Sequence, residues 1–200
     1  MNSAILLAAG KGTRYKGKKQ DVLFLGKPLW ECVYETLTKV VPKDRIVVVG
    51  KDIEGGETRT GSVINGLMAL PKDTERVIIA EAARPLVTQK QIEELLFDES
   101  PSVTFVRPLV NTVIFRDGKY INREELYDML TPQAFDYKRL LEAYMSNKFN
   151  DMTDETRVMY EFHGIKPHLI ETDNNLFKVT YPGDMSIIET LYKEYNLKKD

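Results

Sequence analysis

The chain has 200 residues, of which 42% are hydrophobic and 29% are charged, and its formal net charge is −2. A chain of this length can bury a sizeable core, so we expect a single domain over residues 1–200. The nearly balanced charge argues against broad electrostatic attraction to nucleic acid, which needs an excess of Lys and Arg. No run approaches the ~20 apolar residues that cross a bilayer. We expect neither nucleic acid nor a membrane as a partner.

The single cysteine, Cys32, falls within an apolar pattern with helical spacing, so no intrachain disulfide can form. A buried thiol of this kind fits a reducing compartment. The first residues lack the basic leader of a signal peptide. We therefore expect a cytoplasmic protein.

Short apolar runs alternate with helical patterns in the first half of the chain. The runs are typical of strands buried on both faces of a parallel sheet, and they cover residues 4–9, 46–50 and 76–80. Apolar residues at helical spacing predict helices over residues 28–41, 62–70 and 88–97, the last with Thr88 as N-cap. The alternation predicts the α/β class, with a doubly wound, Rossmann-like and mostly parallel sheet.

The second half contains a segment of different character, residues 110–123. Two β-prone runs flank Asp117-Gly118, which is a strong hairpin-turn signal, so we expect an inserted β-arm. The remaining patterns predict helices over residues 137–145, 156–162 and 184–195, and strands over residues 167–171 and 176–180.

The first predicted strand ends in a small-residue loop. Such residues let a backbone approach a ligand closely, and their N–H groups can face phosphate oxygens. Arg14, Lys16, Lys18 and Lys19 add positive charge nearby. The loop residues expected to bind a nucleotide are Ala8, Ala9, Gly10, Lys11 and Gly12.

Three other interpretations of this loop stay open on the residues alone. A dinucleotide fingerprint would need a third glycine, and Tyr15 stands at that position. A P-loop has the spacing seen from Gly12 to Lys18, but Lys19 stands where a magnesium-binding Ser or Thr is required. An ordinary strand-to-helix turn with solvated lysines would also explain the composition.

From residue 4 to about residue 184 the sequence resembles the cytidylyltransferases that act on 2-C-methyl-D-erythritol 4-phosphate, and their relatives that act on ribitol 5-phosphate. Their first loop reads Ala-Ala-Gly-x-Gly-x-Arg followed by Lys-Gln, which residues 8–14 and Lys19-Gln20 match. The resemblance implies that Arg14 holds the β- and γ-phosphates and that Lys19 neutralises charge at the α-phosphate. The stretch from Arg14 to Lys19 is about two residues shorter than usual, and Lys18 replaces a common proline.

Residues 54–67 combine a glycine turn with the start of a helix, which a loop and an N-cap alone would explain. They are also similar to the family's base-recognition motif, Gly-Gly-x-x-Arg-x-x-Ser-Val. The resemblance implies that Gly56, Glu57 and Ser62 meet the cytosine, with Glu57 where aspartate is more usual. Cytosine offers an amino donor and acceptor edges that these groups can satisfy, which favours CTP over UTP.

Glu81 and Arg84 follow the third strand, where α/β sheets commonly bind ligands. A surface Glu–Arg pair is the alternative. The family usually has His-Asp-Ala-Ala-Arg-Pro here, so Ala80 replaces the histidine and Glu81 the aspartate. The resemblance implies that Glu81 serves Mg²⁺ or another divalent cation, which takes one or two carboxylates plus phosphate oxygens. Arg84 would bind the acceptor's phosphate.

The 110–123 segment and the residues after it complete the expected acceptor site. Asn111 and Ile114 replace an aspartate and a frequent lysine of the family, while Thr131 opens a segment similar to its Thr-Pro-Gln-x-Phe motif. The resemblance implies that Arg123 and Thr131 bind the acceptor. It also implies a homodimer, because in relatives the arm dimerises and lends residues to the neighbouring active site.

Near the C-terminus, residues 153–156 and 176–180 resemble the family's Thr-Asp-Glu segment and its Asn-Ile-Lys-x-Thr strand. The resemblance implies that Lys178 contacts the α-phosphate. A lysine in an apolar strand is otherwise a common way to blunt a sheet edge.

The expected reaction is attack by the acceptor's phosphate oxygen on the α-phosphorus of CTP, with pyrophosphate leaving in line. Such transfers need mainly positioning and charge neutralisation. We expect 2-C-methyl-D-erythritol 4-phosphate as acceptor, on the route to isoprenoid precursors, with ribitol 5-phosphate or another polyol phosphate as the close alternative. A P-loop phosphotransferase and an inactive nucleotide-binding regulator are the other functions considered.

Overall fold

The computed structural model describes residues 1–172 and 176–197. Its centre is a six-stranded sheet in the order β4-β1-β5-β7-β6-β8. β7 runs antiparallel to both of its neighbours, and the other adjacent strands are parallel. The strands are β1 Asn2–Leu7, β4 Ile46–Val49, β5 Arg76–Glu81, β6 Ser102–Pro108, β7 Tyr127–Asp136 and β8 His168–Glu171.

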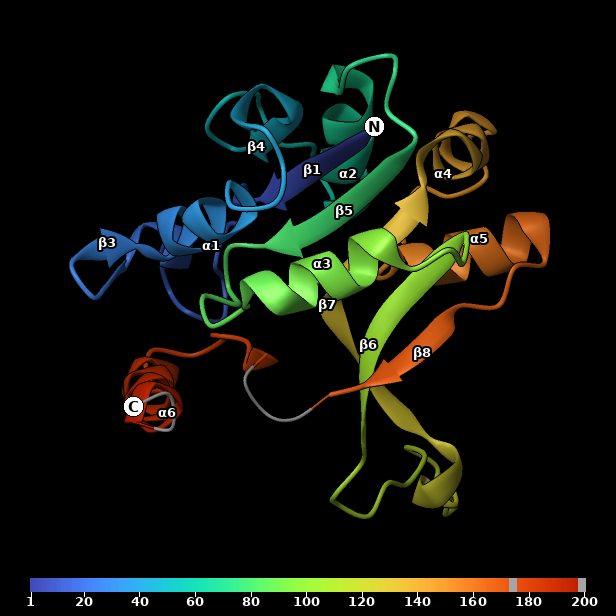
Figure 1. Ribbon diagram of the computed structural model, residues 1–200. Coiled ribbons are helices and arrows are strands. Elements are labelled where there is room, and N and C mark those ends of the chain that lie inside the picture. Colours follow the sequence, from blue (N-terminus) through green and yellow to red (C-terminus); the bar gives the residue numbers. More distant parts are fainter. Residues whose placement is uncertain (173–175, 198–200) are drawn as a thin grey trace.

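Helices cover both faces of this sheet (Figure 1). Alternate β1 side chains explain the arrangement: Leu6 belongs to a buried cluster with residues of α1 and α3, whereas Ile5 belongs to a second cluster with residues of α2, α4 and α5. Burial on both faces is why the first strand is continuously apolar in the sequence. The helices are α1 Leu29–Leu37, α2 Arg59–Ala69, α3 Gln89–Phe97, α4 Tyr137–Met145, α5 Glu155–His163 and α6 Asp184–Leu197. The α/β class and the mostly parallel, doubly wound sheet are thus confirmed.

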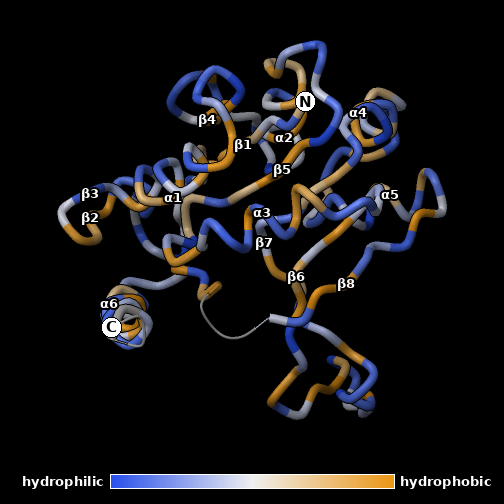
Figure 2. Tube along the Cα trace, in the orientation of Figure 1, coloured by the Kyte–Doolittle hydropathy of each residue, from blue (hydrophilic) through white to orange (hydrophobic). Residues whose placement is uncertain are grey.

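The last helix, α6, lies to one side of these layers. Its Ile188 is buried in a third apolar cluster with Phe24 and Val179. Phe24 belongs to a small hairpin of β2 (Leu23–Phe24) and β3 (Lys27–Pro28), and its ring meets Tyr192 of α6 edge-on at 5.6 Å between centroids. The tube in Figure 2 shows hydrophobic residues along the central strands and hydrophilic ones around the outside.

Thr88 caps α3 as predicted, whereas α2 begins at Arg59, three residues before the predicted start at residue 62. Thr88 caps α3 in a capping box, in which its side chain accepts from the Gln91 N–H and the Gln91 side chain accepts from the Thr88 N–H. Thr58 caps α2 by accepting from the Gly61 N–H at 3.0 Å. Short 3₁₀ turns complete the connections, at Lys19–Asp21, Lys43–Arg45 and Arg123–Glu125.

The predicted strand over residues 176–180 is wrong. Residues 176–180 are described and contain no strand, although the Val179 N–H donates to the Ala83 carbonyl at 2.8 Å. The N–H groups of Thr180 and Tyr181 instead donate to Asp184 Oδ2, which turns the chain into α6. A carboxylate of the first helical turn therefore takes the place of a ladder partner for these two N–H groups.

Besides the short β2 and β3, two strands of the central sheet were not predicted. The sequence analysis assigned no strand to β6 or to the Thr131-Pro132 segment, which lies inside the ten-residue β7 with a cis peptide bond. Opposite this point the β6–β7 register shifts between Thr104 and Phe105. A proline in a central strand removes one donor from the ladder, and such irregularities accommodate it.

Residues 109–126 leave the sheet between β6 and β7 and form the projection at the bottom of Figure 1. Ile114 and Tyr120 pair in antiparallel fashion around a turn in which Gly118 has φ +90°. The Phe115 N–H donates to the Lys119 carbonyl at 2.8 Å. We call this projection the arm segment; its exposed apolar side chains are Val110, Ile114, Phe115 and Tyr120.

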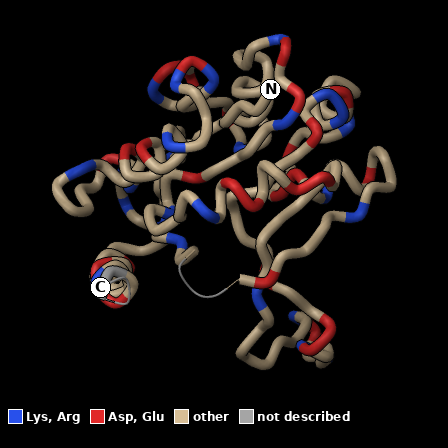
Figure 3. Tube along the Cα trace, viewed as in Figure 1, with Lys and Arg blue, Asp and Glu red and all other residues tan. Residues whose placement is uncertain are grey.

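Acidic and basic side chains are interspersed along the chain (Figure 3). Within residues 1–172 and 176–197, none of the helices combines the length and apolar character needed to span a membrane.

Candidate active site

A cavity of about 280 Å³ lies at the carboxyl ends of β1 and β5. A second hollow of about 660 Å³ adjoins it and shares the loop after β1, extending towards residues 50–56 after β4. Ligands bind outside the carboxyl ends of the strands in open α/β sheets, so this is the expected place for a site. The first cavity is lined by residues 7–11, 56–59 and 81–83 and by Arg14, Lys19, Gln20, Ser62 and Lys178.

Backbone hydrogen bonds fix the loop after β1 at its start and at its turn. The Ala8 N–H donates to the Val49 carbonyl at 2.9 Å, and the Gly17 N–H donates to the Gly12 carbonyl at 3.2 Å. Gly12 has φ +61°, and a Cβ there would lie 1.8 Å from the Gly17 carbonyl oxygen. Gly12 therefore shapes the turn without lining the cavity, whereas Ala8, Ala9, Gly10 and Lys11 do line it.

This loop conformation excludes the P-loop and dinucleotide alternatives. Both patterns place the N-terminus of a helix directly after the glycines. Residues 8–28 are all described and contain no α-helix; a 3₁₀ turn at Lys19–Asp21 and the β2–β3 hairpin follow the loop, and α1 begins at Leu29.

Three cations predicted to bind the triphosphate meet at the cavity. Arg14 and Lys19 come from the first loop, and Lys178 comes from the segment before α6. Lys19 Nζ donates to the Val179 carbonyl at 2.9 Å, which joins these two parts of the chain. Burial lowers the pKa of Lys19, and the neighbouring charge of Lys178 lowers it further, while Glu81 opposes that change. A polyanion would relieve the repulsion between these like charges.

The predicted base-recognition segment forms a tight turn before α2. The Gly56 N–H donates to Ser62 Oγ at 3.0 Å, and Ser62 Oγ donates to the Thr58 carbonyl at 3.2 Å. A Cβ on Gly56 would lie 2.4 Å from the Gly61 carbonyl carbon, so the close approach requires glycine. Gly56, Glu57 and Ser62 all line the cavity, with the Ser62 hydroxyl also organising the turn.

Glu81 ends β5 with a buried carboxylate between two cations. Its Oε2 forms an ion pair with Lys178 Nζ, and its Oε1 lies 3.4 Å from Arg59 Nε. Burial alone would raise the pKa of Glu81, but the charges of Lys178, Arg59 and Arg84 outweigh it and lower the pKa to about 2. Glu81 is therefore ionised over the whole physiological pH range.

The residues present do not form a metal site by themselves. Over the described part of the chain, no group of three or more His, Cys, Asp and Glu side chains is arranged to hold an ion. Both oxygens of Glu81, the predicted magnesium ligand, are occupied by the ion pairs with Lys178 and Arg59. Binding a cation through Glu81 would require one of those pairs to open.

Of the residues predicted for the acceptor, Glu81 lines this cavity, whereas Arg84, Thr131 and Arg123 do not. Arg84 Nε donates to Thr131 Oγ1 at 2.8 Å and its Nη1 donates to the Leu176 carbonyl, so the buried guanidinium joins the turn after β5, β7 and the segment before α6. Burial lowers the pKa of Arg84. Arg123 lies on the arm segment, where it donates to the Val110 carbonyl, and it lines neither hollow.

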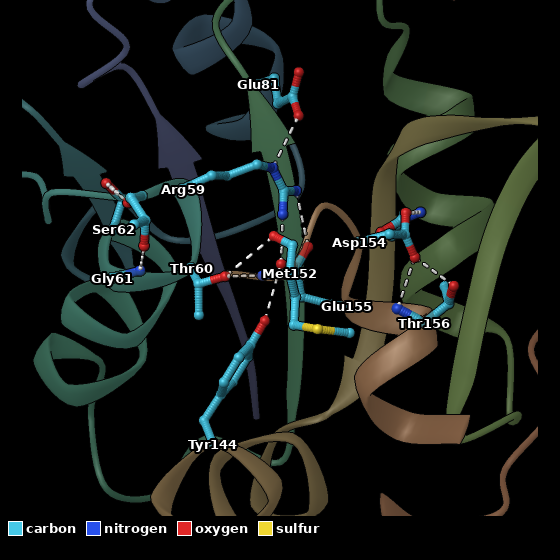
Figure 4. Close-up of polar contacts among 12 residues, drawn as sticks. Arg59, Thr60, Gly61, Ser62, Glu81, Tyr144, Met152, Asp154, Glu155 and Thr156 are labelled. Carbon is cyan, nitrogen blue, oxygen red and sulfur yellow. Dashed lines mark hydrogen bonds and ion pairs between the residues drawn. The ribbon is translucent and has the colours of Figure 1, made fainter. Parts of the chain in front are cut away.

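Sequence reasoning missed a buried ion pair beside the cavity. Arg59 donates from Nη1 and Nη2 to the two oxygens of Glu155, at 2.6 and 2.8 Å, and the Tyr144 hydroxyl donates to the same carboxylate at 3.1 Å (Figure 4). Arg59 opens α2 and Glu155 opens α5. A cation in the first turn of a helix opposes the helix dipole, and that mismatch was the available signal that Arg59 has an anionic partner.

Comparison with known proteins gives a consistent result. A sequence model of the 2-C-methyl-D-erythritol 4-phosphate cytidylyltransferase family matches residues 50–194. The enzyme of that name from Thermotoga neapolitana is 34% identical, with 98% of each chain covered. The one from Clostridium novyi is also 34% identical, with 95% of this chain and 96% of the relative covered.

Solved structures show the same fold. The enzyme of that name from Thermus thermophilus aligns with a TM-score of 0.78 and 25% identity, covering 96% of this chain and 100% of the other. The bifunctional IspDF from Campylobacter jejuni aligns with a TM-score of 0.81 and 29% identity. That alignment covers 92% of this chain and 53% of the bifunctional protein.

Proposed function

Since the chain belongs to the 2-C-methyl-D-erythritol 4-phosphate cytidylyltransferase family, we propose that it transfers a cytidylyl group from CTP to 2-C-methyl-D-erythritol 4-phosphate. The observation that carries this proposal is the meeting of Arg14, Lys19 and Lys178 at one cavity that also holds the predicted base-recognition turn. A triphosphate and a base can thus be bound side by side at the carboxyl edge of the sheet.

In the transfer, a phosphate oxygen of the acceptor attacks the α-phosphorus of CTP. A new P–O bond forms as the bond from the α-phosphorus to the bridging oxygen breaks, and that oxygen's electron pair leaves with pyrophosphate. The attacking oxygen is ionised near neutral pH, so no general base is needed. The protein contributes position and positive charge, which is the main requirement of such reactions.

We assign the charge stabilisation to the three cations at the cavity. Arg14 binds the β- and γ-phosphates, while Lys19 and Lys178 neutralise charge that develops around the α-phosphate. Backbone N–H groups of residues 8–11 complete the cradle. Gly56, Glu57 and Ser62 face the cytosine, and the turn held by the Ser62 hydroxyl fixes their positions.

A divalent cation accompanies the nucleotide in this proposal. Mg²⁺ is commonly bound through substrate phosphates with one or two carboxylates and several waters. Because Glu81 has both oxygens in ion pairs, we assign the cation chiefly to the triphosphate and leave Glu81 to orient Lys178. No step of the transfer is assigned to a metal-bound group.

For the acceptor we propose a site shared between two copies of the chain. Arg84 and Thr131 are linked to each other beside the cavity, whereas Arg123 lies on the exposed arm segment. An arm segment from a second copy would bring a further cation to the acceptor's phosphate. The exposed apolar side chains of the arm segment are consistent with burial against a partner.

Pyrophosphate release tests the proposal directly. The purified chain is incubated with Mg²⁺, with CTP or UTP, and with 2-C-methyl-D-erythritol 4-phosphate or ribitol 5-phosphate. We expect release with CTP and 2-C-methyl-D-erythritol 4-phosphate, together with a product that contains both cytidine and the acceptor. Faster release with ribitol 5-phosphate, or CTP binding without turnover on any acceptor, would contradict it.

A further inference from the structure

Arg59 occupies a position that disfavours a cation, the first residue of α2. The N-terminus of a helix carries a partial positive charge, so an arginine there needs nearby anions. Two carboxylates supply them: Glu155 accepts two hydrogen bonds, and Glu81 Oε1 lies 3.4 Å from Nε (Figure 4). Arg59 thus connects the buried carboxylate of Glu155 with the cavity, which Arg59 itself lines.

One side of this bridge is fixed. Glu155 has no exposed side-chain surface, and it also accepts from the Tyr144 hydroxyl of α4. Beside it, Thr60 Oγ1 accepts from the Met152 N–H at 2.7 Å and donates to the Met152 carbonyl at 3.1 Å. These contacts hold the start of α2 against α4 and α5. The guanidinium of Arg59 is therefore fixed in place on the Glu155 carboxylate.

The other side faces the reacting groups. The planar guanidinium has five donors in a rigid fork, so two nitrogens can engage Glu155 while Nε–H points to Glu81. Glu81 in turn pairs with Lys178 through its second oxygen. The contact from Arg59 to Glu81 is longer than an ordinary N–H···O bond, which leaves Glu81 room to adjust when a ligand enters.

We propose that Arg59 is a positioning residue for the transfer reaction: anchored on Glu155, it orients Glu81 so that Glu81 holds Lys178 at the α-phosphate end of the cavity. This inference rests on the proposed function for the identity of the reaction. It gives Glu155 and Tyr144 a role through Arg59, although neither lines the cavity.

If the Arg59–Glu155 pair served only the stability of the fold, apolar replacements that keep the fold would leave kcat unchanged. If Arg59 positions Glu81, the same replacements should lower kcat. Replacing a buried ion pair by apolar residues of similar volume is often neutral for stability, whereas removing one partner leaves an uncompensated charge. The variant Arg59→Met/Glu155→Met/Tyr144→Phe removes all three polar groups together. We expect it to fold, because no charge or hydroxyl of the group is left unpaired.

The kinetic test compares this triple variant with Arg59→Lys and with the unmodified chain. Lysine keeps the charge but lacks the fork, so it cannot serve both carboxylates. We expect both variants to lose ~10-fold or more in kcat, with KM for CTP within about threefold of the unmodified chain, as for loss of a preorganised contact. A folded triple variant with unchanged kcat would overturn the proposal.

The chain offers a matched control in Arg45. This arginine is nearly buried, and its Nη1 donates to both carboxylate oxygens of the largely exposed Asp73, at 3.0 and 3.2 Å. The pair lies between the 3₁₀ turn before β4 and the loop before β5, and neither residue lines either hollow. The variant Arg45→Met/Asp73→Met should leave kcat unchanged. An equal fall in kcat in this control would mean that loss of any ion pair made by a buried arginine slows the enzyme, which would also overturn the proposal.

A titration separates this inference from the proposed reaction. The carboxyl carbon of Glu81 is followed by NMR from pH 7 downwards in the unmodified chain and in the triple variant Arg59→Met/Glu155→Met/Tyr144→Phe. The charged groups facing Glu81 are Lys178, Arg59, Arg84 and Lys19. The first three together overcome the effect of burial on the pKa of Glu81. We expect its pKa to rise when Arg59 is removed, and an unchanged titration would overturn the proposal. This readout stands even if the chain fails to turn over CTP, in which case only the proposed function fails.

Discussion

The triphosphate end of the candidate site and its acceptor end are assembled in different ways. At the triphosphate end, residues from the first loop, the α2 turn and the segment before α6 meet at one cavity of a single chain. At the acceptor end, Arg84 and Thr131 are bonded to each other, and Arg123 stands on the arm segment. A parallel sheet gathers the ends of its strands at one edge, so the first end follows from the fold alone. In the proposed site, the second end depends on the arm segment, which projects from the sheet.

The largest expected effect is a fall in kcat on removal of a cation at the triphosphate end. Lys178→Ala and Lys19→Ala should each lower kcat by ~10²-fold, comparable to the loss of one preorganised electrostatic group. Steady-state pyrophosphate release measures this. Lys39→Ala, an exposed lysine of the α1 C-terminal turn, is the control and should leave kcat unchanged. Normal turnover in both variants would contradict the proposal that these lysines, with Arg14, stabilise the charge of the triphosphate.

A second prediction concerns Glu81, which lies between the two ends. Its pKa of about 2 in the folded chain is below the ordinary value of 4.5, so the ionised form stabilises the fold above about pH 4.5. That stabilisation is lost as the pH falls from about 4.5 towards 2. Urea unfolding at several pH values should show a flatter dependence for Glu81→Gln, by on the order of 1–3 kcal/mol across this window. Parallel curves for the two proteins would contradict the buried ion pairs.

The third prediction tests whether the acceptor end needs a second chain. Arg123→Ala should raise KM for the acceptor by ~10-fold while KM for CTP stays the same, because the lost cation would act on the acceptor's phosphate alone. Phe115→Asp with Tyr120→Asp should weaken self-association and raise the same KM. Sedimentation velocity and initial rates over a range of enzyme concentrations measure both effects. A monomer with full activity would show that the acceptor site is complete within one chain.

Features that depend on neighbouring residues could be predicted from the sequence, whereas features that depend on contacts between distant residues could not. Burial patterns and caps are local, so β1, β4, β5 and the Thr88 cap could be found from neighbouring residues. The Glu155 partner of Arg59 is 96 residues away, and no local pattern reveals it. Residues 176–180 have a strand-like composition, but their contacts with Ala83 and Asp184 decide their conformation.

Amino-acid composition alone also does not determine which kind of phosphate loop follows β1. Its glycines and lysines resemble three kinds of nucleotide loop. Tyr15 and Lys19 depart from two of those patterns, and the absence of an α-helix in residues 8–28 decides between them.

The predicted triphosphate residues of the first loop and of the α2 turn reach one cavity because they follow the neighbouring strands β1 and β4, apart from Gly12, which shapes the turn. Lys178 reaches it through contacts of Val179 with Lys19 and Ala83, which sequence order does not reveal. Sequence order carries no equivalent constraint for Arg123, because the arm segment is exposed and its position relative to the cavity depends on contacts outside the sheet.

The smallest expected effect comes from two helix caps of the same chemistry. Thr58 caps α2 beside the cavity, and Thr88 caps α3 away from it; each accepts a hydrogen bond from the N–H three residues later. Thr58→Ala and Thr88→Ala should each cost about 1 kcal/mol of unfolding free energy, the usual value of a cap. Only Thr58→Ala should also raise KM for CTP, by about two- to fivefold, because its loss loosens the turn that carries Gly56 and Ser62. Equal KM values in the two variants would show that the turn is held by the Ser62 hydroxyl alone, and the α2 cap would then contribute to the fold without shaping the base site.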